Sequence, residues 1–205
     1  MKIVLASMSP RRKEMMLWLG VPFTAVAPDI DESSIRGDDP VALTQLLAQA
    51  KAEAVAMDLK DGVVIGSDAV VSFNNQILEK ARDSQHQREL INMQKGQIAQ
   101  SVSSVCIINA EDGQKVVETR VTRYKVSNPP DHVVEAYISS GKGLDKAGGF
   151  GLQDENGFLL DELYGCYTNL IGFPLCAVAE ILQNMGIKIE VDIKQEVEKR
   201  TGRKC

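Results

Sequence analysis

The sequence predicts an α/β protein in which helices flank a mixed β-sheet. Apolar, β-branched runs of strand length alternate with longer amphipathic segments in both halves of the chain. Near the middle, two pairs of strand-like runs are separated only by short turns, and hairpins join antiparallel strands, so a purely parallel sheet is excluded. The chain of 205 residues is 44% hydrophobic and 25% charged, which is typical of a globular protein. We expect one domain, or two tightly fused lobes, over residues 1–193 and a charged, frayed tail over residues 194–205.

The first third of the chain predicts strand, helix, strand, loop and long helix, in that order. Residues 2–6 form a short apolar run that suits a buried strand, and Ser9-Pro10 supplies an N-cap hydroxyl and a first-turn proline for the next helix. Gly20 is placed to end that helix. We expect a second strand over residues 21–27, an acidic loop over residues 29–39 and an amphipathic helix that begins at Pro40.

The middle of the chain predicts two hairpins separated by a helix. Residues 63–73 form a strand interrupted at Gly66-Ser67-Asp68, and Asn74-Asn75 turns it into a short partner. A helix is expected over residues 84–95. Two alternating, β-branched segments follow, over residues 101–109 and 115–124, with a turn at Glu111-Asp112-Gly113 between them.

The last third predicts two helices on either side of a glycine-rich segment. Asn128-Pro129-Pro130 leads into a helix near residues 131–140, and residues 141–157 are rich in glycine. The second helix spans about residues 174–185 and is ended by Gly186.

Charge and hydropathy exclude several function classes. The net charge of −5 argues against a nucleic-acid partner, which usually meets a basic face. The longest apolar runs are too short for a signal peptide or a membrane span, so we expect a soluble, cytoplasmic protein without a membrane partner. The four cysteines show no CxxC spacing, which argues against a zinc knuckle and favours reduced thiols.

Three cations open the first predicted helix. Arg11, Arg12 and Lys13 follow Ser7 and Ser9 at the point where a strand gives way to a helix. A helix N-terminus offers free N–H groups and a partial positive charge, which suits a phosphate group. Cations in a first turn oppose the helix dipole, and a bound polyanion would resolve that conflict. The alternative is an ordinary N-cap with solvated charges.

Separated carboxylates and lysines could complete a phosphate site. Glu32 lies in the acidic loop, and Asp68 follows an apolar strand run, where ligands of α/β sheets bind. A carboxylate there can hold a divalent cation or accept a proton from water, although Asp68 could equally cap a turn. Lys51 and Lys80 would neutralise phosphate oxygens, or would simply be solvated surface charges.

Read together, these segments resemble the Maf family of nucleoside triphosphate pyrophosphatases, from about residue 3 to residue 182. Its opening S-x-S-P-R-R stands at residues 7–12, and its S-D-T-V-V reads Ser67-Asp68-Ala69-Val70-Val71. The family's loop glutamate, helix lysine and later lysine match Glu32, Lys51 and Lys80. Its D-K-A-G stands at residues 145–148, its glutamine at Gln153, and its N-V-V-G-L-P-L is altered at residues 169–175.

The sequence also departs from the family pattern at four positions. The threonine after the aspartate is Ala69, and the proline after Lys80 is Ala81. The histidine of an H-x-V-x-T-G segment is replaced by Ala99, and the aspartate of a late G-D-Y by Cys166. These changes leave the phosphate and metal groups intact and affect the choice of base.

The resemblance implies a Maf/ITPase-like fold of two lobes with a cleft between them, and a nucleoside triphosphate as the substrate. It implies hydrolysis between the α- and β-phosphates, with Mg²⁺ or Mn²⁺ held by Glu32 and Asp68. Asp68, Lys51 and Lys80 would be catalytic, and the substrate would contact Ser7, Arg11, Arg12, Lys13, Ala69 and Gln153.

The resemblance is nearest to the dTTP/UTP-cleaving subgroup, through the unbroken Pro10-Arg11-Arg12 and through Gln153, whereas Ala69 departs from it. A homodimer is also implied. The alternative function is a non-catalytic nucleotide-binding regulator of cell division, which the intact Asp68 argues against because a sensor needs no general base.

Overall fold

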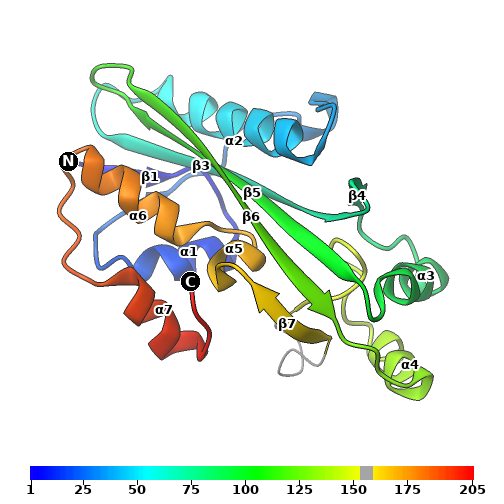
Figure 1. Ribbon diagram of the computed structural model, residues 1–205. Helices are drawn as coiled ribbons and strands as arrows, with labels where there is room; N and C mark the ends of the chain where they lie inside the picture. The colour runs from blue at the N-terminus through cyan, green and yellow to red at the C-terminus, as the bar shows by residue number, and fades with distance from the viewer. Residues whose placement is uncertain (153–158) are drawn as a thin grey trace.

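A mixed β-sheet runs through the whole molecule (Figure 1). The computed structural model describes residues 1–152 and 159–205. In this part of the chain the sheet has seven strands in the order β2-β1-β3-β5-β6-β7, and β4 pairs with β3 beside this path. β1 is parallel to β2 and β3, and the other pairs are antiparallel. The strands are β1 (Ile3–Leu5), β2 (Thr24–Ala25), β3 (Val63–Phe73), β4 (Gln76–Leu78), β5 (Ile98–Asn109), β6 (Lys115–Val126) and β7 (Leu160–Tyr164).

Helices cover both faces of the sheet, as the α/β prediction required. α2 lies along one face, α1, α6 and α7 lie on the other, and α3 and α4 gather at the far end of the long strands (Figure 1). The helices are α1 (Pro10–Leu17), α2 (Pro40–Ala56), α3 (Ser84–Gln94), α4 (Asp131–Ser139), α5 (Tyr167–Leu170), α6 (Leu175–Asn184) and α7 (Ile193–Thr201), with a 3-10 turn η1 (Glu32–Ser34).

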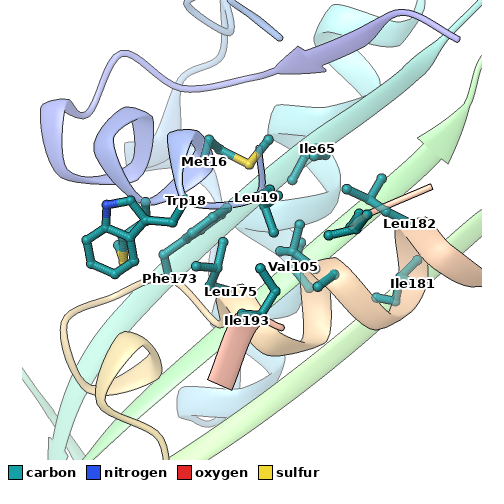
Figure 2. Packing of buried hydrophobic residues seen from close by; sticks show 14 of the residues in the cluster. Met16, Trp18, Leu19, Ile65, Val105, Phe173, Leu175, Ile181, Leu182 and Ile193 are labelled. Carbon is teal, nitrogen blue, oxygen red and sulfur yellow. The ribbon is translucent and has the colours of Figure 1, made fainter. Parts of the chain in front are cut away.

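The first core lies between the sheet and helices α1, α6 and α7. Figure 2 shows Phe173 and Leu175 packed beside Leu19 of the α1 end and Val105 of β5. A smaller core joins α2 to the opposite face of the same strands. These two cores make the sheet fully buried at this end, which explains the continuous apolar runs in β1 and β3.

A second, distal core forms at the other end of the long strands. Its members come from α3, α4, the ends of β5 and β6, and residues near β7 and α5; they include Ile91, Tyr124, Tyr137, Phe150 and Leu159. β3, β5 and β6 each contribute to both cores: Ile65, Val105 and Val116 pack in the first, and Phe73, Ala99 and Tyr124 in the distal one. The molecule therefore has two lobes that share their central strands.

Local capping matches the sequence signals. The Ser9 side chain accepts a hydrogen bond from the Arg12 amide at the start of α1, and Asp39 caps α2 in the same way ahead of Pro40. Asn74 and Asn75 have φ values of 49° and 63°, which is the left-handed geometry of the tight hairpin turn predicted between β3 and β4.

Three expectations need correction, and the sequence signals predict neither β7 nor α5. The strand expected over residues 21–27 contains only Thr24 and Ala25. The charged segment expected to fray forms α7, because Ile193 and Val197, one helical turn apart, are buried in the first core. Cys166 and Cys205 form a disulfide, whereas Cys106 and Cys176 are free. Reduced thiols had been expected at all four positions.

None of the helices in the described residues is long and apolar enough to cross a membrane.

Candidate active site

The turn from β1 into α1 presents a helix N-terminus at the carboxyl end of a parallel strand. Ser7 is buried, and its Oγ accepts a hydrogen bond of 3.2 Å from the Ser9 amide. Ser9 and Pro10 then start the helix, so the side chains of Arg11 and Arg12 leave its first turn. Pro10 has no N–H, and the amides of Arg12 and Lys13 bond Ser9 Oγ and the Ser9 carbonyl. The positive end of the helix dipole, the Arg11 N–H and the two guanidinium groups therefore form a single positive region.

Both arginines reach from α1 to backbone carbonyls of distant segments. Arg11 Nη1 donates to the Ile171 carbonyl at 3.1 Å, and Arg12 Nε donates to the Gly172 carbonyl at 3.2 Å. Arg12 Nη1 also donates to the Ser67 carbonyl at 2.6 Å. Burial lowers the pKa of Arg12 below its ordinary value, while the nearby Asp68 and Glu32 oppose that effect. An arginine stays protonated at any physiological pH, so Arg12 is a fixed, half-buried positive charge.

A buried ammonium group joins the two predicted metal-binding carboxylates. Lys51 Nζ lies 2.7 Å from Asp68 Oδ1 and 3.0 Å from Glu32 Oε2. Lys51 is only 6% exposed and Asp68 only 8% exposed, whereas the Glu32 side chain is 56% exposed. Three residues from α2, β3 and η1, up to 36 positions apart in the sequence, therefore form one charged cluster.

A glycine allows α2 to approach β3 closely enough for this contact. A Cβ atom at Gly66 would lie 2.3 Å from the Ala48 carbonyl oxygen and 2.6 Å from the Ala52 nitrogen. Any side chain at this position would push the helix off the strand. Lys51, between Ala48 and Ala52 on α2, would then be drawn away from Asp68.

Burial and charge act in opposite directions on Asp68. Burial raises the pKa of its carboxyl group above the ordinary value, and Lys51 and then Arg12 counteract part of that shift. A buried carboxylate favours either a proton or a nearby cation. The group can therefore accept a proton, or help to bind a cation, more readily than an exposed aspartate.

The carboxylates also fit a hard divalent cation. Magnesium and manganese prefer oxygen ligands, and each carboxylate here uses one oxygen for Lys51, so its second oxygen remains available. Glu32 lies on a short exposed turn, whose N-cap Asp31 bonds the Ser33 amide at 3.0 Å. The donor set is consistent with the predicted metal site at Glu32 and Asp68.

A cleft of about 200 Å³ opens beside this cluster. One side of the cleft is formed by Ser9, Arg11, Arg12 and the loop at residues 170–172. We call residues 7–13, together with the neighbouring Lys51 and Asp68, the charged wall. The other side is formed by residues 146–147 and 150–152, and we call the segment 143–152 the loop wall. Ala69, directly after Asp68, lines the floor between them.

Two buried glutamines of α3 hold the loop wall. Gln87 Nε2 donates to the carbonyls of Lys142 and Gly149, at 2.7 and 2.8 Å, and Gln94 Nε2 donates to the Gly148 carbonyl at 2.9 Å. Gly148 and Gly149 have φ values of 75° and 84°, which explains the glycine that ends the D-K-A-G segment and the glycine that follows it. An isolated antiparallel bridge between Lys80 and Ala147 ties the same loop to the end of β4.

The structure brings some of the predicted site residues together and leaves others apart. Lys51, Asp68, Glu32 and Arg12 form the cluster, with Ser7 and Arg11 beside it. Lys80 is exposed at its bridge to Ala147, and Lys13 is half-buried; among the described residues, neither side chain makes a hydrogen bond or ion pair. Gln153 lies outside the described residues.

Most residues that line the cleft are not among the site residues predicted from the sequence. Phe150, Leu152 and Ser101 contribute apolar and hydroxyl surface, and the Ile171 and Gly172 carbonyls position the arginines. For Ile171 and Gly172, the sequence signal is the family motif matched at residues 169–175. Ser101 lies in the altered H-x-V-x-T-G segment that begins at Ala99, but the motif does not show which of its side chains reaches the cleft, because that depends on the register of β5.

Comparisons with known proteins agree with this geometry. The family model described as "Maf-like protein" matches residues 2–185. The chain is 34% identical over 192 residues to a dTTP/UTP pyrophosphatase of Clostridium novyi, covering 92% of this chain and 100% of the relative. It is 37% identical over 186 residues to a dTTP/UTP pyrophosphatase of Deinococcus radiodurans, covering 91% and 94%.

A solved structure supports the fold. The Ham1 protein of Staphylococcus aureus superimposes with a TM-score of 0.52 at 14% identity, over 90% of this chain and 100% of that one. At this level of identity the likeness concerns the architecture alone.

Proposed function

The chain belongs to the Maf family, and from this membership we propose that it is a nucleoside triphosphate pyrophosphatase. The proposed reaction is hydrolysis between the α- and β-phosphates, which gives a nucleoside monophosphate and pyrophosphate. The observation that carries the proposal is the Lys51 ammonium that holds Asp68 and Glu32 together beside an arginine-rich helix start.

The charged wall supports binding of the triphosphate. Phosphoryl transfer depends mainly on positioning and on neutralising charge, and the wall supplies Arg12, Arg11 and the positive N-terminal end of α1. Ser7 and Lys13 lie on the same segment and would add a hydroxyl and a further cation. Lys80 would act from the opposite side of the cleft, next to Ala147.

Asp68 is the group best placed to accept a proton from the attacking water. Its carboxylate is buried, its pKa is raised by that burial, and Lys51 fixes one of its oxygens. As the water oxygen bonds to phosphorus, its proton passes to Asp68 and the phosphoanhydride oxygen leaves with pyrophosphate. Lys51 offsets the negative charge that gathers on the phosphate oxygens.

A divalent cation, Mg²⁺ or Mn²⁺, would be held by Glu32 and Asp68 and would neutralise charge on the triphosphate. The two carboxylates offer one oxygen each beyond those that contact Lys51. With the cation bound, Lys51 would keep both carboxylates oriented toward the same point.

Pyrimidine triphosphates are the proposed substrates, either UTP and dTTP or modified forms of them. The relatives named dTTP/UTP pyrophosphatase support this choice. Ala69 on the cleft floor lacks the hydroxyl that the family's threonine would offer, so we propose that other bases are accepted as well. A homodimer stays a prediction from the family resemblance, and a cytoplasmic location stays a prediction from the short apolar runs of the sequence.

The proposal is tested by measuring pyrophosphate release from canonical and methylated nucleoside triphosphates, with Mg²⁺ or Mn²⁺. The Asp68→Asn variant keeps the shape of the side chain but removes its charge and basicity, so we expect turnover to be abolished while triphosphate binding stays measurable. Asp161→Asn is the matched control, because Asp161 is an exposed aspartate of β7 that pairs with Lys125.

Undiminished pyrophosphate release from Asp68→Asn would refute the catalytic role of this residue. Nucleotide binding without any pyrophosphate release by the unmodified protein would instead favour the non-catalytic regulator.

A further inference from the structure

Three cysteine sulfurs meet beside α5 and the first turn of α6, in a cavity whose lining shares no residue with that of the cleft. Cys166 precedes α5, Cys176 lies in the first turn of α6, and Cys205 is the last residue of the sequence. Their Sγ atoms all lie within 4.8 Å of one another. The three residues come from three separate segments, so their meeting is a property of the fold and not of local sequence.

The disulfide accounts for only two of these sulfurs. Cys166 and Cys205 are bonded, and Cys176 is a free, half-buried thiol beside them. Contacts other than the disulfide also hold the segments in place. The Tyr167 amide donates to the Lys204 carbonyl at 3.1 Å, which fixes the chain end against α5. Thr168 Oγ1 lies 3.0 Å from Cys166 Sγ and 3.5 Å from Cys205 Sγ.

The three cysteines line a cavity of about 190 Å³ that also contains charged and amide groups. Arg120 and Lys194 lie on its lining and would offset the excess negative charge of three thiolates around a divalent cation. Glu180 supplies a carboxylate, 3.0 Å from Arg120. Asn169 lines the same cavity and is fully buried, and its Oδ1 has no hydrogen-bond partner among the described residues.

We propose that the reduced form of this protein binds one Zn²⁺ ion through the thiolates of Cys166, Cys176 and Cys205. Zinc sites with three cysteines take a fourth, nitrogen or oxygen ligand in a tetrahedral arrangement. Glu180 and Asn169 place oxygen donors in the cavity, which favours Zn²⁺ over Cu⁺, because Cu⁺ prefers sulfur alone. The site is separate from the proposed Mg²⁺ or Mn²⁺ site and does not depend on the proposed function.

Binding of Zn²⁺ at this site requires a reductant for the disulfide and releases protons from the thiols. A dithiol or phosphine reductant first gives two electrons to the Cys166–Cys205 bond, which becomes two thiols while the reductant is oxidised. Three thiols then bind Zn²⁺ and release three protons in all, because the thiolate is the ligand. Affinity should therefore rise with pH.

The test uses Co²⁺ as a spectroscopic substitute for Zn²⁺ on the full-length chain. The protein is reduced with a phosphine without oxygen, the reductant is removed, and Co²⁺ is added. We expect a thiolate-to-cobalt charge-transfer band that saturates at one ion per chain and disappears when Zn²⁺ is added. A cation at the carboxylates of Glu32 and Asp68 gives no such band, so the two sites are distinguished.

Serine variants assign the ligands. Cys166→Ser, Cys176→Ser and Cys205→Ser should each weaken Co²⁺ binding by more than about tenfold, because loss of an outer-shell partner alone costs about 10- to 100-fold and each variant removes a ligand itself. Cys106→Ser is the matched control, because Cys106 is buried between the sheet and α2 and should leave the band unchanged. Absence of the band in the reduced protein, or an unaltered band in Cys176→Ser, would overturn the proposal.

A measurement on the unmutated chain covers the case in which a variant does not fold. Reduced protein is alkylated with and without Zn²⁺, and the modified cysteines are identified by mass spectrometry. We expect Zn²⁺ to slow the alkylation of Cys166, Cys176 and Cys205 together. If Cys176 reacts at the same rate with and without Zn²⁺, the three-cysteine site is wrong.

Discussion

The two walls of the cleft are built by different means. The charged wall rests on regular elements: Asp68 on β3, Lys51 on α2 and Arg12 in the first turn of α1. The loop wall belongs to no helix or strand, and the side chains of Gln87 and Gln94 hold it through backbone carbonyls. The charged groups that chemistry needs are thus fixed by the fold, whereas the surface that shapes the pocket is fixed by buried amides.

This difference predicts how each wall responds to substitution. Damage to the charged wall should reduce turnover and phosphate binding, because it removes charge from rigid positions. Damage to the loop wall should loosen the pocket and weaken substrate binding, with less effect on the chemical step.

The largest effect is expected from Lys51→Met, which keeps the length of the side chain but removes the charge that joins Asp68 to Glu32. We expect kcat to fall by about 10²–10³, the usual cost of losing a well-placed electrostatic group. Steady-state pyrophosphate release checks this. Lys115→Met is the matched control, because Lys115 pairs with Glu53 at the exposed side of α2. A loss below tenfold would show that the ammonium is not part of the catalytic machinery.

A smaller effect is expected from Arg12→Ala. Hydrogen bonds to charged groups contribute about 1.5–3 kcal/mol, so triphosphate affinity should weaken by about 10- to 100-fold. The loss should shrink for the diphosphate and again for the monophosphate. Calorimetric titration of all three ligands into the Asp68→Asn background checks this, with the exposed Arg123→Ala on β6 as the control. Equal losses for all three ligands would mean that Arg12 does not contact the phosphate tail.

Gln87→Leu tests the loop wall. The change leaves the carbonyls of Lys142 and Gly149 without their donor, which costs about 1–3 kcal/mol of folding stability. We expect KM to rise several-fold with little change in kcat, and hydrogen exchange over residues 143–152 to become faster. Gln85→Leu, at an exposed position of the same helix, should change neither KM nor the rate of hydrogen exchange over residues 143–152. If kcat falls and KM does not change, the loop wall takes part in the chemical step.

The smallest effect is expected from Ala69→Thr, on the floor between the walls. A Cβ atom at Gly172 would lie only 3.5 Å from Ala69 Cβ, so a threonine hydroxyl would stand in the space next to that loop. We expect kcat/KM to shift a few-fold in favour of UTP and dTTP over CTP and GTP, without a change of reaction. Identical kcat/KM ratios in both proteins would show that this position does not determine the preferred base.

The charged wall could be predicted from sequence because its signals are local. Ser9-Pro10 marks a helix start, and the apolar run before Asp68 marks a strand, so each residue could be placed on an element. The Lys51 contact to Asp68 could not be predicted, because it depends on the close packing that Gly66 permits between α2 and β3.

Other parts of the fold depend on distant partners. β7 is short and partly polar, and it exists because it pairs with the end of β6. α7 lies in a charged segment whose two buried residues, Ile193 and Val197, gain their role only from the first core. The meeting of Cys166, Cys176 and Cys205 likewise follows from tertiary structure, since their spacing matches no local motif.

The three long strands shared by the lobes have a consequence for motion. β3, β5 and β6 pass from the first core to the distal core without a break. A hinge needs a few residues that absorb large changes in φ and ψ, and hydrogen-bonded strands in the middle of a sheet do not allow such changes. Opening and closing of the cleft therefore requires small, reversible changes in the twist and curvature of the whole sheet. The distance between the lobes changes by small amounts, without a hinge at one position.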